Sequence, residues 1–351
     1  MNEETTSDRP LVSIIIPNYD YAKTLGACLR AAFGQTHHPL EVVVVDDGST
    51  DESVRIAEEF PCELLKTANG GVSSARNLGA RHSRGEILFF LDSDVELRPD
   101  AVAVAVELLD ADPSLGAVCG IYDWVPLVDD GVVERYKVLH GHFWRVRSAG
   151  EVRLASFSLG AFRRGVFEAV GPLDENLRYT EDVEYGARMS AVSRIETSTR
   201  IVGRHDDDDK LSVLLRKQFT RSIPLVALFV QRGPERPRLD DTAFRPTGVA
   251  AATIAVAAVP AALVWPWLLP LPALCLVAFA ASERALLGFV RGKAGTRFTL
   301  LFLVLHLLMN FTTGAAAGVG AVRWLVSGRF RRYYRQGERV PTTSARGAVD
   351  A

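Results

Sequence analysis

LVSIIIPNYD at residues 11–20, EVVVVDDGSTD at 41–51 and GEILFFLDSDV at 85–95 share one pattern. Each is a short apolar run, rich in β-branched or aromatic residues, that ends in a polar cluster. Short continuous apolar runs of this kind are typical of strands that are buried on both faces of a sheet. The three stretches therefore predict three buried strands, each followed by side chains that carry charges or hydrogen-bonding groups.

The segments between these runs predict helices, so that strands and helices alternate with short connections. Helices are expected at residues 21–33, 51–60, 70–83 and 99–110, and further strands at 62–66 and 116–122. This alternation predicts an α/β fold of Rossmann-like type, with a mostly parallel sheet and helices on both faces. Ligands of such sheets bind beyond the carboxyl ends of the strands, where the polar clusters fall. One binding site is therefore expected there.

The composition indicates balanced charge and no disulfide framework. The chain has 40 Lys and Arg residues against 42 Asp and Glu residues, so no excess charge favours nucleic acid as a partner. Its four cysteines are widely spaced, without a C-x-x-C pair, as is typical of buried thiols in a reducing compartment. The N-terminus MNEETTSDRP lacks the basic start and apolar core of a signal peptide. We therefore expect the first domain on the cytoplasmic side.

The C-terminal third is strongly apolar. Residues 249–281 form a stretch of 33 residues without one charge. A single helix of that length would be about 50 Å long, against roughly 30 Å for the hydrocarbon core of a bilayer. The central WPWLLPLP would also interrupt a helix. The stretch predicts a hairpin of two short membrane helices, with a buried core hairpin of a soluble protein as the alternative.

A second uncharged stretch at residues 298–322 predicts a further membrane-associated helix. The connection between the stretches carries Arg284, Arg291, Lys293 and Arg297, and the tail after the second one carries Arg329, Arg331, Arg332, Arg335 and Arg339. The positive-inside rule places both basic segments in the cytoplasm. Three full crossings cannot satisfy both placements, whereas two can, so the number of crossings stays open. We expect a multi-pass inner-membrane protein whose catalytic domain faces the cytoplasm.

These patterns predict a division of the chain into five parts. They are a polar tail at residues 1–10, a catalytic domain at 11–230 with an interfacial amphipathic helix near 210–230, a linker at 231–247, membrane helices at 248–327 and a basic tail at 328–351.

The D-S-D cluster is the first candidate for chemistry. Asp92 and Asp94 follow a buried strand directly, so both carboxylates can face one cation. Hard oxygen ligands suit Mg²⁺ or Mn²⁺, which also bind diphosphate oxygens. A solvated acidic turn is the alternative, because two acidic residues alone are a weak signal.

Five motifs occur in an order that resembles a known family. They are VSIIIPNYD, VVVVDDGSTD, NGGVSSARNLGA, GEILFFLDSDV and GPLDENLRYTEDVEYGARM. The chain resembles the family 2 glycosyltransferases, in particular membrane-anchored bacterial members, from about residue 11 to residue 230. The resemblance implies the GT-A fold and an inverting transfer of sugar from a nucleoside-diphosphate sugar. It also implies a divalent metal and a role in cell-envelope polysaccharide or glycolipid synthesis.

The resemblance implies a nucleotide site and a metal site. For the nucleotide it implies Pro17, Tyr19, Asp46, Asp47, Arg76 and Asp92. For the metal it implies Asp94 with Asp92, and His205 as a third ligand. The alternatives are turn and capping roles for Asp46 and Asp47, a salt bridge on a helix surface for Arg76, and an ordinary surface position for His205.

The T-E-D-V-E motif supplies the implied catalytic residues. Asp182 matches the catalytic base of the family, and Glu181 is expected to orient the site or to bind the acceptor. A carboxylate at a helix start is stabilised by free N–H groups and by the helix dipole. We therefore expect Asp182 to be ionised at neutral pH and able to accept a proton. Two ordinary first-turn acids are the alternative.

The sequence QFTRS at residues 218–222 departs from the Q-x-x-R-W motif of processive synthases, because Ser222 replaces the tryptophan. A single addition to a lipid-linked or membrane-proximal acceptor is therefore expected, with a UDP-sugar as the donor. A processive polysaccharide synthase and a non-catalytic nucleotide-sugar-binding membrane protein are the alternatives. A nucleotidyltransferase would need a glycine-rich phosphate loop after the first strand, and PNYDYAKT is not one.

Overall fold

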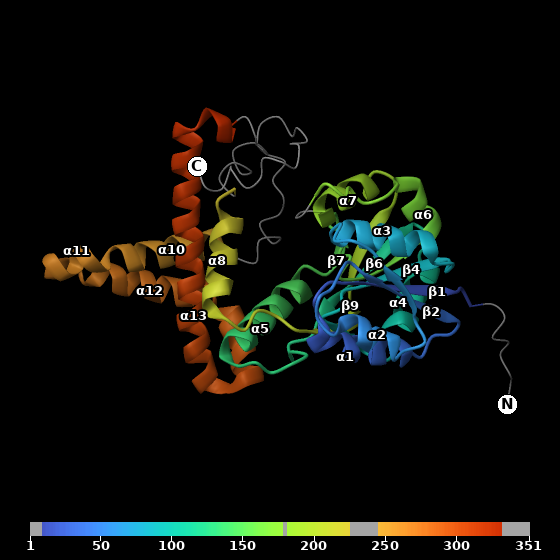
Figure 1. Ribbon diagram of the computed structural model, residues 1–351. Coiled ribbons are helices and arrows are strands. Elements are labelled where there is room, and N and C mark those ends of the chain that lie inside the picture. Colours follow the sequence, from blue (N-terminus) through green and yellow to red (C-terminus); the bar gives the residue numbers. More distant parts are fainter. Residues whose placement is uncertain (1–8, 178–180, 225–244, 332–351) are drawn as a thin grey trace. The chain divides into compact units, whose positions relative to one another are not determined.

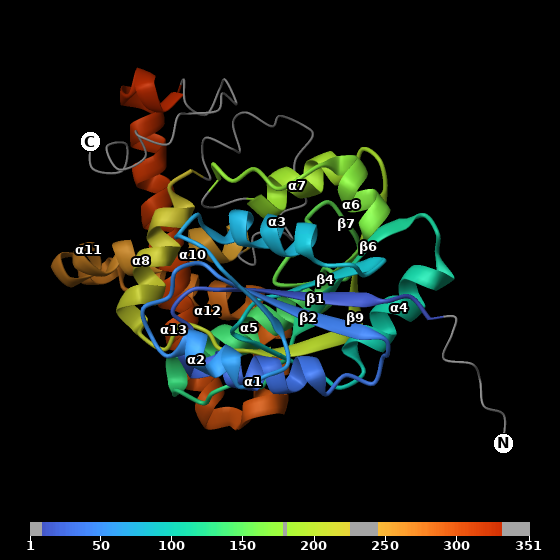
Figure 2. The ribbon, with the colours of Figure 1, turned by 45° about the vertical axis from the view of Figure 1, so that its right-hand side comes forward.

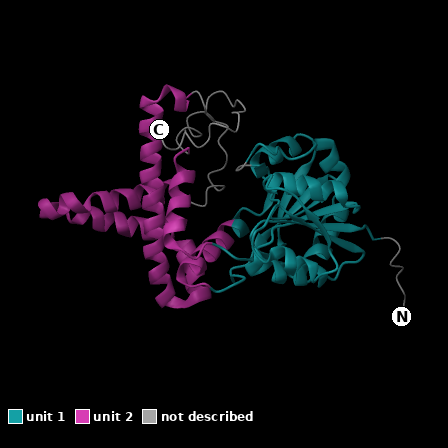
Figure 3. Cartoon of the chain, viewed as in Figure 1, with its two compact units in different colours: residues 1–129, 145–207 teal, residues 130–144, 208–351 magenta. Residues whose placement is uncertain are grey.

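The computed structural model describes residues 9–177, 181–224 and 245–331, and the chain divides into two compact units. Unit 1 comprises residues 1–129 and 145–207, and unit 2 comprises residues 130–144 and 208–351 (Figure 3). This division differs from the expected domains, because the segment after residue 207 packs with the C-terminal helices. Parts of the expected tails, of the linker and of the 210–230 helix lie outside the described residues.

Unit 1 is a sheet covered by helices on both faces. Its strands are β1 (Val12–Asn18), β2 (Leu40–Asp46), β3 (Glu63–Lys66), β4 (Ile87–Leu91), β5 (Val95–Leu97), β6 (Leu115–Tyr122), β7 (Gly150–Val152), β8 (Leu159–Arg163) and β9 (Arg194–His205). Its helices are α1 (Ala22–Phe33), α2 (Ser53–Glu58), α3 (Val72–His82), α4 (Ala101–Ala111), α6 (Arg164–Val170) and α7 (Glu181–Met189). Helix α5 (Val132–Arg147) begins in unit 2 and ends in unit 1.

The sheet has the strand order β3-β2-β1-β4-β8-β6-β9-β5, and β7 also pairs with β9. Strands β3, β2, β1 and β4 are parallel, as the sequence predicts. Strand β8 is antiparallel to both of its neighbours, and β5 and β7 are antiparallel to β9, so the sheet is mixed. The predicted α/β fold with helices on both faces is confirmed.

The apolar runs are strands because each of their side chains meets a helix. Ile14 and Ile16 on β1 lie in the hydrophobic cluster formed with α1 and α4, whereas Ile15 lies in the cluster on the opposite side. Figures 1 and 2 show α1, α2 and α4 over one face of the sheet, and α3, α6 and α7 over the other. A strand covered on both faces needs apolar residues at every position.

Unit 2 contains most of α5 and the C-terminal helices. They are α8 (Leu211–Ser222), α10 (Pro246–Ala257), α11 (Val259–Val264), α12 (Pro270–Ser282) and α13 (Arg284–Val326), with a 3₁₀ turn at Pro266–Leu268. The helix breaks at Trp265, within WPWLLPLP, and α12 returns along α10, as the sequence predicts for a hairpin. Helix α8 packs against α13, where Gln218 Nε2 donates a hydrogen bond to Thr313 Oγ1 at 2.9 Å.

The basic connection between the apolar stretches is helical, which the sequence did not predict. Residues 284–294 form the first part of α13, and the helix is interrupted at Gly295, whose φ is 79°. This part is helical because Leu286 and Val290, one helical turn apart, are both buried. Two described helical stretches, Pro246–Val264 and Arg284–Val326, are long and apolar enough to cross a membrane.

Candidate active site

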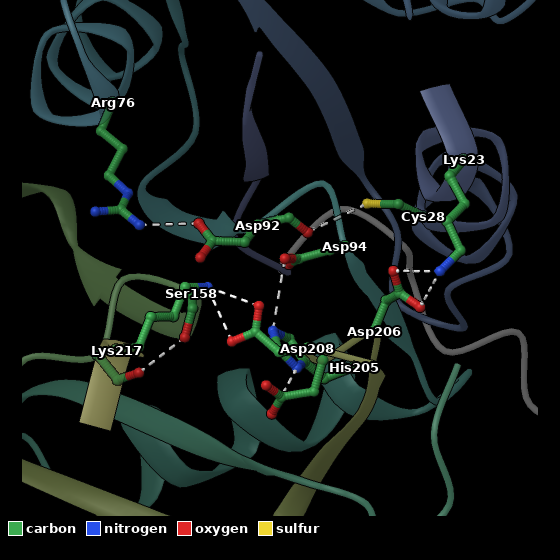
Figure 4. Close-up of polar contacts among 12 residues, drawn as sticks. Lys23, Cys28, Arg76, Asp92, Asp94, Ser158, His205, Asp206, Asp208 and Lys217 are labelled. Carbon is green, nitrogen blue, oxygen red and sulfur yellow. Dashed lines mark hydrogen bonds and ion pairs between the residues drawn. The ribbon is translucent and has the colours of Figure 1, made fainter. Parts of the chain in front are cut away.

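The D-S-D cluster lies at the end of β4. The short strand β5 follows the cluster and pairs with β9, so the cluster lies beside the end of β9. Val95 of β5 lies opposite His205 in the antiparallel pair. His205 Nε2 is therefore 3.5 Å from Asp94 Oδ2, and His205 Nδ1 is 3.6 Å from Asp207 Oδ2 (Figure 4). Strand β5, which the sequence did not predict, brings together two predicted metal ligands that lie far apart in the chain.

The charges around His205 favour a cation at this point. Burial lowers the pKa of His205, but the carboxylates of Asp207 and Asp94 outweigh that effect and raise it to about 9. Asp94 Oδ1 is buried, and it has no hydrogen-bond partner within the described part of the chain. The pair of Asp94 and His205 thus combines a carboxylate oxygen without a partner with an imidazole, which becomes a metal donor when the metal displaces its proton.

These donors fit a divalent metal that is shared with a nucleotide. Carboxylate oxygen and imidazole nitrogen are both ligands for Mn²⁺. Among residues 9–177, 181–224 and 245–331, no three His, Cys, Asp or Glu side chains converge closely enough to hold a metal by themselves. Of the predicted metal ligands, Asp92 points its Oδ1 at Arg76. Two protein donors suffice where diphosphate oxygens and water complete the coordination shell.

Arg76 of α3 joins the D-S-D cluster to the predicted catalytic pair. Its Nη2 donates a hydrogen bond to Asp92 Oδ1 at 2.8 Å, and its Nη1 donates to Glu181 Oε1 at 3.2 Å. Figure 4 shows the guanidinium pointing at Asp92. The guanidinium also lies over the ring of Phe157, 5.5 Å from its centroid. The alternative interpretation of Arg76 was a salt bridge on a helix surface. The salt bridge exists, but only 4% of the Arg76 side chain is exposed, so the salt bridge is buried within the site.

Asp182 lies in the first turn of α7, beside this arginine. Burial raises the pKa of Asp182 to about 7, and although Arg76 opposes the shift, the charges of Glu181 and Asp92 add to it. Its Oδ1 is buried, without a hydrogen-bond partner among the residues that the structure describes. At a pKa of about 7 Asp182 is only partly ionised at neutral pH, because burial opposes the stabilisation by the helix dipole on which the expectation of an ionised carboxylate was based. A pKa near 7 suits a group that accepts a proton.

The acidic pair after β2 holds the surrounding loops together. Asp46 Oδ1 accepts a hydrogen bond from Asn18 Nδ2 at 3.1 Å, and Asp46 Oδ2 accepts one from the Ser49 amide at 3.0 Å. The Asp47 carboxylate accepts the backbone amides of Gly70 and Gly71, at 2.8 and 2.7 Å. The turn role of the alternative interpretation is thus present for both residues.

A cavity of about 430 Å³ opens beside these groups. It is lined by the ends of β1, β2 and β4 and by the start of α3, including Pro17, Tyr19, Asp47, Asp92 and Asp94. Tyr19 is 44% exposed, so its ring is available for stacking. The cavity therefore combines a flat aromatic surface with four carboxylates, those of Asp47, Asp92, Asp94 and Glu175, as the predicted nucleotide site requires. The roles of these residues remain predictions.

The other predicted residues lie behind this lining. Asp46 is buried under the loops, and Arg76, Glu181, Asp182 and His205 are not among the lining residues. Arg76, which also contacts Glu181, is connected to the cavity through Asp92. His205 is connected to it through Asp94.

Two neighbours of the site have no predicted role. Asn18 ends β1, lines the cavity and donates a hydrogen bond to Asp46. Tyr122 ends β6, and its ring stacks on that of His205 with centroids 4.3 Å apart. Both are polar residues at strand ends, so the rule that located the acidic clusters could have located them as well.

Comparison with known proteins agrees with the geometry of unit 1. Residues 13–171 match the profile described as "Glycosyl transferase family 2". Chondroitin synthase of Escherichia coli is 40% identical over 114 residues, which are 31% of this chain and 17% of that protein. The uncharacterized glycosyltransferase EpsJ of Bacillus subtilis is 30% identical over 189 residues, 49% of this chain and 54% of the relative. The chain thus spans from about a sixth to about half the length of these relatives.

One solved structure is similar over both units. It is the mannosyltransferase PcManGT of Pyrobaculum calidifontis in complex with GDP-Man and Mn²⁺. Its identity to this chain is 25% and the TM-score is 0.53, and the match covers 92% of this chain and 89% of the other.

Proposed function

From the match of residues 13–171 to glycosyl transferase family 2, we propose that the chain is an inverting glycosyltransferase. It moves one sugar from a nucleoside-diphosphate sugar to a lipid-linked or membrane-proximal acceptor. The observation that carries the proposal is the bridge from Asp92 through Arg76 to Glu181. This bridge joins the predicted donor-binding cluster to the predicted catalytic pair beside one cavity, as sugar transfer requires.

The donor is bound in the cavity at the strand ends. Tyr19 stacks on the nucleobase, and Asp47 and Asn18 offer hydrogen-bonding groups to the base and ribose. The expected donor was a UDP-sugar, whereas the similar mannosyltransferase was solved with GDP-Man. Both nucleotides therefore belong in a donor screen.

Asp94 and His205 hold the divalent metal. When bound, the metal supplies positive charge against the leaving diphosphate. The mannosyltransferase that resembles this chain over most of its length was solved with Mn²⁺, which supports the proposal. Asp92 is kept in place by Arg76, so it can meet the ribose or the metal without searching through rotamers.

Asp182 acts as the general base. Its deprotonated Oδ1 accepts the proton of the acceptor hydroxyl. The hydroxyl oxygen of the acceptor then bonds to the anomeric carbon as the bond from that carbon to the diphosphate breaks. Glu181 is held by Arg76 at 3.2 Å and is thereby fixed beside the base. Attack from the side opposite the diphosphate inverts the anomeric centre. General-base catalysis contributes roughly 10²- to 10⁴-fold to such a step.

The acceptor is proposed to lie at a membrane because the helices of unit 2 expose apolar side chains. Leu263, Trp267, Leu274 and Leu325 are between 66% and 75% exposed. Two stretches pass the length and hydropathy requirements of a membrane span. We place the catalytic domain at the cytoplasmic face, where nucleotide sugars are available.

The proposal is tested with the full chain in detergent or in membranes. Release of nucleoside diphosphate from UDP- and GDP-sugars is measured with a lipid extract as acceptor, and the labelled lipid is analysed by mass spectrometry. EDTA is expected to abolish release, and Mn²⁺ to restore it. Asp94→Ala should lower the rate strongly, whereas Asp110→Ala, an exposed aspartate on α4, should not. Full activity in Asp94→Ala would reject the assignment.

Product length separates the alternatives. The 40% identity with a chondroitin synthase is confined to 114 residues and keeps a processive synthase as a second candidate. One added sugar per acceptor supports the single addition, and a ladder of products supports the synthase. Nucleotide binding without any transfer, for every donor and acceptor tried, would instead favour a binding protein.

A further inference from the structure

Tyr122 stands at the end of β6, directly beside the predicted metal ligand His205. It is 8% exposed and lies opposite Gly203 in the β6–β9 pair, two residues before His205. The rings of Tyr122 and His205 are 4.3 Å apart between centroids, with an angle of 11° between their planes. The imidazole therefore lies flat on the phenol ring.

The carboxylates of Asp94 and Asp207 do not fix the orientation of the His205 ring, which therefore depends on packing. The distances from the imidazole nitrogens to Asp94 and Asp207, 3.5 and 3.6 Å, are long for hydrogen bonds. A charge at such a distance attracts the ring but imposes little direction on it. The parallel contact with Tyr122, in contrast, opposes rotation of the imidazole out of its plane.

Tyr122 is itself held from two directions. The guanidinium of Arg145, at the end of α5, lies 4.3 Å from the centroid of the Tyr122 ring. The side chain of Ser158 is a polar neighbour of the phenol, and the Ser158 carbonyl accepts the backbone amide of Asp92 at 3.0 Å. The ring is thus connected to the loop that carries the D-S-D cluster.

We propose that Tyr122 is a positioning residue that holds the imidazole of His205 in the plane from which Nε2 faces Asp94. The inference rests on the proposed function, because it assumes that Asp94 and His205 hold the metal. Arg145 supports the position of the Tyr122 ring from the surface of unit 1.

The test measures metal binding directly. The full chain in detergent is titrated with Mn²⁺ in the presence of UDP or GDP, and free Mn²⁺ is followed by EPR. Tyr122→Met fills the space without a flat ring, since methionine adapts to irregular gaps, and it should weaken Mn²⁺ binding about tenfold or more, as loss of an outer-shell partner does. Tyr122→Phe keeps the ring and should bind Mn²⁺ as tightly as the wild type.

A spectroscopic measurement separates positioning from general stability. Pulsed EPR of bound Mn²⁺ should detect the nitrogen coupling of the imidazole in wild type and in Tyr122→Phe, and a weakened coupling in Tyr122→Met. Wild-type affinity and coupling in Tyr122→Met would overturn the inference. Equal losses in Tyr122→Phe and Tyr122→Met would also overturn it, because the hydroxyl and not the ring would then matter.

Two controls distinguish this inference from the proposed function. His205→Ala and Asp94→Ala should each weaken Mn²⁺ binding. If neither does, the proposed metal pair is wrong, and the role of Tyr122 falls with it. If both do but Tyr122→Met does not, only the present inference fails. Should Tyr122→Met not fold, the exposed Arg145→Ala decides: about a threefold loss with altered nitrogen coupling supports positioning, and unchanged values contradict it.

Discussion

Each unit buries a cluster of polar side chains, and the two clusters differ in what they leave unpaired. In unit 1, Arg76 is the cation among Asp92, Glu181 and Asp182, so the acidic groups are in excess. Within the described residues, carboxylate oxygens of Asp94 and Asp182 are buried without a hydrogen-bond partner. Asp92 and Asp94 also line the cavity. This cluster has both the charge and the space to bind a ligand.

The polar side chains of the unit 2 cluster contact one another. Tyr136 Oη and His306 Nδ1 share a hydrogen bond at 2.9 Å, and Asn310 Nδ2 donates to the His306 carbonyl at 2.9 Å. Glu283 Oε2 lies 3.7 Å from His306 Nε2, and both side chains are 2% exposed. The ring of Phe302 packs on both His306 and Tyr136. These contacts tie α5, the start of α13 and its middle together.

The comparison shows that burial of polar groups does not by itself identify a site. Among the described residues of the unit 1 cluster, the buried oxygens without a hydrogen-bond partner belong to carboxylates, and Asp94 lines the cavity. In the unit 2 cluster the corresponding atom among the described residues is Asn310 Oδ1, a neutral amide oxygen, and Tyr136 pairs with His306 across two helices. Removing a group from the first cluster should therefore change chemistry, and removing one from the second should change stability.

The largest effect is expected from Asp182→Asn. The amide cannot accept a proton from the acceptor, so kcat should fall by roughly 10²- to 10⁴-fold, while the donor KM changes little. Initial rates of nucleoside diphosphate release measure both parameters, with Asp110→Asn as the matched control. A kcat within twofold of wild type would remove Asp182 from the mechanism and would weaken the contrast between the clusters.

Arg76→Met should have the next largest effect, on folding. It leaves Asp92, Glu181 and Asp182 near one another without their buried cation, and breaking such a pair costs about 3–5 kcal/mol. Hydrogen exchange of α3 and α7 should accelerate, and the thermal unfolding midpoint should fall. Arg76→Lys keeps the charge but not the two-armed contact, so an intermediate loss is expected. Unchanged exchange in Arg76→Met would show that the cluster does not depend on its arginine.

Tyr136→Phe tests unit 2 and should cost less. The change removes the hydrogen bond to His306 Nδ1, which costs about 1–3 kcal/mol in a buried position. The unfolding midpoint should fall, while kcat per folded molecule stays at the wild-type value. Val132→Ala, an exposed position on the same helix, serves as control. A fall in kcat comparable to that of Asp182→Asn would mean that the polar cluster of unit 2 takes part in catalysis.

Much of unit 1 could be predicted from the sequence because its signals are local. The apolar runs that form β1, β2 and β4 are continuous, and the polar clusters follow each strand within two or three residues. The hairpin around Trp265 was also predicted, since proline and the length of the stretch are local properties.

The rest depends on contacts between distant segments. Strand β5 is three residues long and is formed through its pairing with β9, so no periodicity reveals it. The bridge of Arg76 to Glu181 joins residues that are 105 positions apart. The ionisation of Asp182 was predicted only in part, because the helix start is visible in the sequence, whereas the burial that raises its pKa is not.

The smallest expected effect is a change in the pH profile of kcat/KM. It distinguishes the unit 1 cluster from the unit 2 cluster in variants that stay folded. Asp182 acts as a base when deprotonated, and its pKa is raised to about 7. kcat/KM should therefore rise about tenfold per unit below pH 7 and level off above it. Because Arg76 lowers this pKa, Arg76→Lys should keep the inflection near its position, and Arg76→Met, where folded, should move it upward. Tyr136→Phe should follow the wild-type curve, since its hydroxyl belongs to unit 2. An inflection that persists in Asp182→Asn would assign the titration to another group, and the unpaired oxygen of Asp182 would then carry no chemistry.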